Sequence, residues 1–197
     1  MEVMQTVETE ERMTCLQVQL YHPQQASKGL YCHLPLDCSS KHQAEDPLRL
    51  GRDEKVCTYI LVDPRVSRKQ LSLQAYRTAQ SPDLLFTVQN LSQKGRLMVN
   101  GSELDYLERA ELPAKALLRF GDYEILICRE PGEAKGSFEV EFGVLTVPPS
   151  REMGLGVSTM TPVMDTGLGH DVSNDFPAEL ISTHVPLECD ETFIYQS

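Results

Sequence analysis

The chain has 197 residues, with 18 Lys and Arg against 29 Asp and Glu, a formal net charge of −11. Its 41% apolar and 24% charged residues are typical of a folded protein of one or two domains. There is no run of 18 apolar residues, which argues against a transmembrane helix, and no Lys/Arg-rich block, which argues against nucleic acid as a partner. The acidic N-terminus has no apolar segment of the secretory kind, so we expect a cytoplasmic protein with reduced thiols at its six cysteines.

The negative charge is concentrated at the two ends. Residues 1–12 hold four Glu and one Arg, a net of −3, and residues 151–197 hold eight acids and one Arg, a net of −7. Only −1 remains for residues 13–150. Acidic ends without a repeating apolar face behave as solvated tails, so the sequence predicts tails over 1–13 and 148–197 around a domain over 14–147.

Within that domain the apolar residues alternate with period two, as in half-buried strands. Leu16, Val18 and Leu20 begin the pattern. Further short runs of strand character follow at 29–35, 47–50, 57–62, 70–77, 84–90, 96–99, 115–120, 123–129 and 136–146. Turn signals such as Asp63-Pro64 and Asn100-Gly101 separate them. This pattern, with no convincing amphipathic helix, predicts an all-β antiparallel sandwich of about ten to eleven strands.

Signatures of enzymes and metal sites are absent from the sequence. It contains no GxSxG, P-loop, GxGxxG, HExxH or EF-hand pattern, no CxxC pair, and only five dispersed histidines. We therefore expect a protein that is not an enzyme and needs no metal or cofactor.

Several predicted loops instead carry polar residues suited to an anion. Gly51-Arg52 closes one strand, and the guanidinium group is the best bidentate partner of a phosphate. Ser67-Arg68-Lys69 precedes the next long strand, and Asn90 to Gly95 follows the one after it. Asn100-Gly101 and Gly121-Asp122 complete the series.

The order of these loops resembles the forkhead-associated (FHA) family, β-sandwiches that bind phosphothreonine peptides through loops at one end. The resemblance implies that Gly51, Arg52, Ser67, Asn90 and Lys94 form the peptide site. Arg52, Ser67 and Lys94 would contact the phosphate, and Asn90 would hydrogen-bond the peptide backbone. The sequence departs from the family pattern at Gln70, where a structural His is usual, and in the loop 92–96, which reads SQKGR.

A narrower resemblance, to TRAF-interacting proteins with an FHA domain, comes from both ends of the chain. Glu8-Thr9-Glu10-Glu11 and Val66 to Gln70 match that group, which implies that Thr9 is phosphorylated and captured by another copy. Near the C-terminus, Pro186, Glu188 and Glu191 fit the motif by which TRAF ubiquitin ligases bind an extended peptide. The implied partners are a second copy in a homodimer and in higher oligomers, a TRAF-type ligase and an upstream α-kinase that responds to bacterial sugars. The implied outcome is NF-κB activation in innate immunity.

Three alternatives remain open from the sequence. A lipid or calcium module would need acidic loops, whereas these loops carry Arg52, Arg68, Lys69 and Lys94. A hydrolase on a sandwich scaffold would need a convergent nucleophile and base. A paralogous phosphopeptide-binding protein that inhibits the adaptor would lack either the Thr9 context or the tail motif, and this chain has both.

Overall fold

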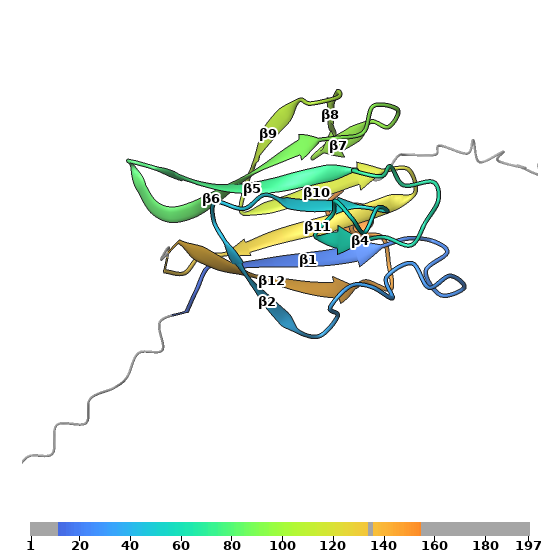
Figure 1. Cartoon of the computed structure of the whole chain (residues 1–197), viewed down its shortest axis with the longest axis horizontal. Helices are drawn as coiled ribbons and strands as arrows, with labels where there is room; N and C mark the ends of the chain where they lie inside the picture. Colours follow the sequence, from blue (N-terminus) through green and yellow to red (C-terminus); the bar gives the residue numbers. More distant parts are fainter. Residues whose placement is uncertain (1–11, 134–135, 155–197) are drawn as a thin grey trace, which may run out of the picture. The chain divides into compact units, whose positions relative to one another are not determined.

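The computed structural model describes residues 12–133 and 136–154. Their strands form two sheets, shown in Figure 1. In chain order the elements are β1 (Cys15–Tyr21), β2 (Ser39–Gln43), β3 (Leu48–Gly51), β4 (Tyr59–Ile60), β5 (Leu71–Thr78), β6 (Ser81–Asn90), β7 (Leu97–Val99), β8 (Ser102–Leu104), β9 (Arg109–Leu112), β10 (Lys115–Phe120), β11 (Tyr123–Glu130), β12 (Ser137–Val144) and the short helix α1 (Pro149–Glu152). The predicted all-β sandwich is confirmed.

The first strand occupies the middle of the larger sheet. The order in that sheet is β2-β12-β1-β11-β10-β7-β8, and in the smaller sheet β4-β3-β5-β6-β9. β1 is antiparallel to β11 and parallel to β12, and β3 is parallel to β4, so the sandwich is mostly rather than wholly antiparallel. Leu16, Val18 and Leu20 face inward from β1, as their alternation predicts.

Inward side chains of both sheets form one apolar core. Phe86 on β6 and Phe138 on β12 meet across it edge to face, with ring centroids 4.9 Å apart. Tyr59 on β4 and Phe142 on β12 make a second such contact at 4.5 Å. Large buried aromatic pairs of this kind hold the two sheets in fixed alignment, which in turn fixes the loops at the ends of the strands.

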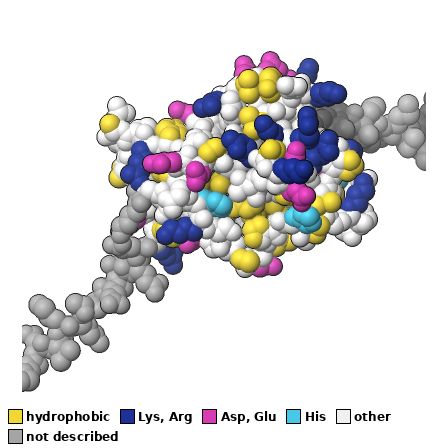
Figure 2. Space-filling model, in the orientation of Figure 1, with side chains coloured by type: hydrophobic (Ala, Val, Ile, Leu, Met, Phe, Trp, Pro, Cys, Tyr) yellow, Lys and Arg dark blue, Asp and Glu magenta, His cyan; other side chains and the backbone are white. Residues whose placement is uncertain are grey.

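The direction of β1 defines two ends of the sandwich. Tyr21 at its C-terminal end lies opposite Glu124, next to the turn at Gly121 and Asp122. Cys15 at its start lies opposite Glu130, at the other end of β11. The end of the sandwich where β1 stops is here named the loop end. Figure 2 shows several Lys and Arg side chains gathered there.

Three strands were not predicted, and one predicted strand does not form. Residues 29–35 make local turn hydrogen bonds, such as Leu34 N–H to the Tyr31 carbonyl, 2.9 Å, instead of pairing in a sheet. Their apolar side chains are nevertheless buried, which explains the false signal. β2 reads SSKHQ and has no apolar residue, since an edge strand is held by backbone bonds to β12. The short strands β8 and β9 also lie at sheet edges.

The folded part of the chain continues beyond residue 147, where the sequence predicts a tail. The carboxylate of Glu124 on β11 accepts hydrogen bonds from the Ser150 backbone N–H at 2.9 Å and the Ser150 hydroxyl at 2.8 Å. Pro149 and Ser150 are buried by this contact. A four-residue helix therefore anchors the chain to the sandwich directly after β12.

Candidate functional site

Two loops at the loop end are joined backbone to backbone. Arg52 N–H donates to the Ser67 carbonyl at 3.1 Å, and Asp53 N–H donates to the Arg68 carbonyl at 3.2 Å. Gly51 makes this approach possible, because a Cβ atom there would lie 2.3 Å from the Arg68 carbonyl oxygen. The predicted Gly-Arg and Ser-Arg-Lys motifs are thus neighbours, and the glycine is required by close packing.

The hydroxyl of Ser67 is held by the third loop. Ser67 Oγ lies 2.6 Å from Ser92 Oγ, and Ser92 Oγ also accepts the N–H of Gly95 at 2.8 Å. Ser67 N–H donates to Gln70 Oε1 at 3.2 Å. These bonds fix both ends of Ser67 while leaving the residue partly exposed.

Gln70, at the position where the FHA pattern has a histidine, is a buried brace between loops. Its carbonyl accepts Leu91 N–H at 3.0 Å, so the residue links the Ser67 loop to the Ser92 loop. Its side-chain Nε2 is buried without a hydrogen-bond partner among the described residues. Gln70 therefore supplies an acceptor where it is needed but leaves one donor unused, which is destabilising in a buried site.

Asn90 is buried beneath the third loop. Its Nδ2 donates to the carbonyls of Gly95 at 3.0 Å and Leu104 at 2.9 Å, and its Oδ1 accepts Ser92 N–H at 3.0 Å. The residue has 0% of its surface exposed. The FHA resemblance implies that Asn90 contacts the peptide. In the structure its side chain instead braces the loop.

Ser67 and Lys94 line one cleft, and Arg52 lines the hollow beside it. The cleft, about 210 Å³, is also lined by Arg65, Arg96 and Asp122. The hollow contains Arg52 and Arg68, and Asp63 borders both spaces. Within the described residues, the side chains of Arg52, Arg68 and Lys94 form no ion pair. Lys94 thus shares the cleft with Ser67, whereas Arg52 and Arg68 line the adjoining hollow, which also contains Asp53 and Glu54.

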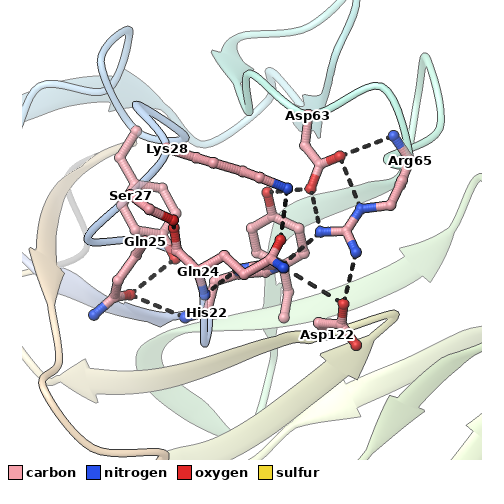
Figure 3. Close-up of polar contacts among 10 residues, drawn as sticks. His22, Gln24, Gln25, Ser27, Lys28, Asp63, Arg65 and Asp122 are labelled. Atoms are coloured by element: carbon pink, nitrogen blue, oxygen red, sulfur yellow. Dashed lines mark hydrogen bonds and ion pairs between the residues drawn. The ribbon is translucent and has the colours of Figure 1, made fainter.

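Arg65, which also lines the cleft, lies at the centre of the polar cluster drawn in Figure 3. Its guanidinium donates to Asp63 at 3.0 and 3.2 Å and to Asp122 at 2.8 Å, and lies 3.0 Å from His22 Nε2. Tyr123 donates its hydroxyl to Asp63 at 3.2 Å. The cluster ties the end of β1 to the β4–β5 connection and to the β10–β11 turn.

Burial and hydrogen bonding set the charges in this cluster. Burial and the neighbouring Arg65 cation lower the pKa of His22, so its ring is neutral at pH 7. Burial would raise the pKa of Asp63, but hydrogen bonds from Arg65 and Tyr123 outweigh it and lower the pKa below its usual value. By formal charge, Asp63 and Asp122 outnumber Arg65 by one in this cluster. Within the cleft, an incoming anion is therefore favoured on the side of the unpaired Lys94.

The described residues include all five positions predicted for the site and none of the predicted motifs in the tails. Arg52, Ser67 and Lys94 line the cleft and hollow, Gly51 packs against the Arg68 backbone, and Asn90 is buried beneath the third loop. Thr9 and the motif at Pro186, Glu188 and Glu191 fall outside the described residues. Sequence reasoning missed Ser92 and the Arg65 cluster. Asp63-Pro64 was interpreted only as a turn, and no motif connects Arg65 with a turn 57 residues further along the chain.

Comparison with known proteins first gives the class. Residues 48–121, which include Gly51 and Ser67, match the family described as the FHA domain. Solved FHA domains show weak overall similarity. One of an Arabidopsis thaliana hypothetical protein has a TM-score of 0.44 at 15% identity, covering 64% of this chain and 92% of that one. The MEK1 FHA domain in complex with the HOP1 pThr318 peptide has a TM-score of 0.37 at 17% identity, covering 46% and 94%.

Curated relatives then give the family. The rat (Rattus norvegicus) TRAF-interacting protein with FHA domain-containing protein A is 38% identical over 142 residues, 72% of this chain and 77% of the relative. Its human (Homo sapiens) counterpart is 37% identical over 135 residues, 68% and 73%. The human TRAF-interacting protein with FHA domain-containing protein B is 32% identical over 139 residues, which cover 71% of this chain and 83% of that relative. The chain belongs to the family of TRAF-interacting proteins with an FHA domain.

Neither a membrane span nor a metal centre emerges from the described residues. No helix in 12–133 and 136–154 is long and apolar enough to cross a bilayer. No cluster of His, Cys, Asp and Glu in the same residues is grouped to hold a metal ion.

Proposed function

We propose that the loop end binds a phosphothreonine peptide as a non-catalytic recognition module. The observation that carries the proposal is the fixed Ser67 hydroxyl, 2.6 Å from Ser92 Oγ, with the unpaired Lys94 in the same cleft. The unpaired Arg52 lies in the adjoining hollow, and its backbone N–H donates to the Ser67 carbonyl. Charge-assisted hydrogen bonds to a dianionic phosphate are worth about 1.5–3 kcal/mol each. Three of them, after the cost of association, correspond to roughly micromolar binding.

The ligand we propose is phospho-Thr9 of another copy. The first strand starts at the end away from the cleft, six residues or about 20 Å from the loop end. Thr9 precedes Cys15 by six residues, a tether of at most about 21 Å. Reaching its own cleft would use the entire tether and leave no length for the turn back. This geometry favours capture by a second molecule, and head-to-tail contacts between copies propagate into larger assemblies.

In the assembled state the C-terminal motif would act in many copies. Pro186, Glu188 and Glu191 would bind a TRAF-type ubiquitin ligase as an extended peptide, and clustering would raise the avidity of individually weak contacts. The family name supports a TRAF partner. We further propose a cytoplasmic adaptor that is a homodimer before phosphorylation, receives the Thr9 phosphate from an α-kinase and activates NF-κB in innate immunity.

Mass measurement by light scattering tests self-capture. The full chain is compared with and without phosphate on Thr9, and again with Arg52→Ala. Lys115→Ala is the matched control, since this exposed cation lies at the start of β10, away from the cleft. We expect growth beyond the unphosphorylated species only when phospho-Thr9 and Arg52 are both present. No growth, together with binding of a phospho-Thr9 peptide, would indicate the paralogous regulator that binds without assembling. No peptide binding would refute the proposed site.

A further inference from the structure

The outer face of the smaller sheet has a second set of groups suited to an anion. Arg49 pairs with Ser72, Ser72 with Gln89, and Gln89 with Arg109 in consecutive cross-strand positions. We call these four residues the arginine row. All four point away from the core, because their sequence neighbours on β3, β5, β6 and β9 are the inward-facing residues.

The arginine row lines a hollow of its own. The hollow has a volume of about 190 Å³, and Thr87 and Gln74 add further polar groups to its wall. None of its lining residues lines the Ser67 cleft or the Arg52 hollow. The two anion sites are therefore built from separate side chains, although Arg49 and Gln89 are only a few residues from Gly51 and Asn90.

The cations of the row are uncompensated. In the described part of the chain, neither the Arg49 nor the Arg109 side chain has an ion pair or hydrogen bond, whereas Arg65 and Arg96 both pair with acids. Glu111, two residues after Arg109 and on the same face of β9, interacts with Tyr76. Among the residues that the structure describes, no acid lines the hollow.

The geometry favours an anion with several acceptor oxygens. Arg49 and Arg109 flank Ser72 and Gln89 from opposite sides, three strand spacings apart, or about 14 Å between the Cα atoms. Ser72 is 8% exposed and its hydroxyl has no partner among the described residues, while Gln89 is fixed by its bond to the Leu107 carbonyl at 2.9 Å. Guanidinium forks and a hydroxyl that approach from different directions match the three oxygens of a phosphate monoester better than a planar carboxylate.

We propose that the arginine row binds a phosphate monoester, carried by a phosphorylated side chain or by a small phosphorylated molecule. The site does not include Arg52, so this proposal can be refuted without refuting the proposed recognition of phospho-Thr9, and the reverse also holds. Its position on the same sheet as the Gly51 and Ser67 loops would let one chain hold two phosphorylated groups at once.

The test is an NMR titration of the full-length chain carrying Arg52→Ala, which disables the first site. One arm adds inorganic phosphate, and a second adds the peptide Gly-Gly-phosphoSer-Gly-Gly. We expect saturable shifts at the guanidinium Nε–H groups of Arg49 and Arg109 and at the amides of Ser72 and Gln89. Binding should weaken at least about ten-fold when Arg49→Gln and Arg109→Gln are added. The control pair, Lys41→Gln with Lys115→Gln, removes equal charge from exposed positions on the other sheet and should change little.

The two arms separate the sources of the ligand. Tighter binding of the peptide than of inorganic phosphate identifies a phosphorylated side chain, and equal or weaker binding identifies a small phosphorylated molecule. Shifts that sodium chloride reproduces at equal ionic strength, or that persist in the double Arg variant, would overturn the inference. So would the absence of saturable shifts in a variant whose spectrum shows the native fold.

Discussion

Replacing Asn90 tests whether its buried side-chain amide braces the loop or contacts a ligand. Asn90→Ala removes three hydrogen bonds, to the carbonyls of Gly95 and Leu104 and from the N–H of Ser92, at distances of 2.9–3.0 Å. Each buried group left without a partner costs about 1–3 kcal/mol. Water entering the vacated space would satisfy part of this, so we expect a loss of about 3–5 kcal/mol, a large share of the roughly 5–15 kcal/mol that typical domains have.

Urea unfolding measures this loss. With a slope of about 2 kcal/mol/M, the midpoint should fall by roughly 2 M. The neighbouring variant Gln89→Ala removes one hydrogen bond at a half-buried site and should cost only about 1 kcal/mol. If Asn90→Ala lost less than about 1 kcal/mol of stability while abolishing phosphopeptide binding, Asn90 would be a direct ligand contact and the bracing role would be refuted.

Three further changes test other parts of the structure. Gly51→Ala places a Cβ 2.3 Å from the Arg68 carbonyl oxygen. It should lower the free energy of unfolding by about 1–3 kcal/mol and weaken phosphopeptide binding. Unchanged binding in calorimetry would contradict the pairing of the Gly51 and Ser67 loops. Phe86→Ala, at a 1% exposed core position, should lower the unfolding free energy by about 3–5 kcal/mol, and a loss below 1 kcal/mol in urea would be inconsistent with the core contact to Phe138. Because the folded pKa of His22 lies below its unfolded value of about 6.5, stability should be full above pH 6.5 and decline as the pH falls toward the folded pKa. His22→Asn should flatten that decline in denaturation series between pH 5 and 7.5, and an unchanged slope would argue against a neutral buried ring.

The strands that could be predicted are those with one face in the core. β1, β10 and β11 alternate or run apolar because their inward side chains fill the sandwich, and such patterns are visible in sequence. β2 lacks any apolar side chain, since backbone bonds to β12 and the contacts of His42 with Tyr59 and Phe138 hold it. The apolar residues of 29–35 gave the opposite error, because side chains can be buried from a series of turns as well as from a strand.

For the site, sequence order identified the loops but not the direction of each side chain. Arg52, Ser67 and Lys94 were expected at one end of the sandwich and line neighbouring spaces there, and Gly51 lets the Arg52 and Ser67 loops meet. An asparagine after a strand suits a ligand contact and a loop brace equally well. The sequence therefore could not predict that Asn90 is buried. The arginine row depends on register across four strands, and no linear motif contains it.

The central position of β1 also affects how the protein is made. Its partners β11 and β12 follow it by more than 100 residues. At about 5–20 residues per second, a ribosome needs several seconds or more after β1 to supply them. During that time the segment CLQVQLY has no ladder partner, and closing so long a loop slows folding. The smaller sheet, whose strands are close in sequence, can form first, so the nascent chain is expected to expose an unpaired apolar strand that chaperones recognise.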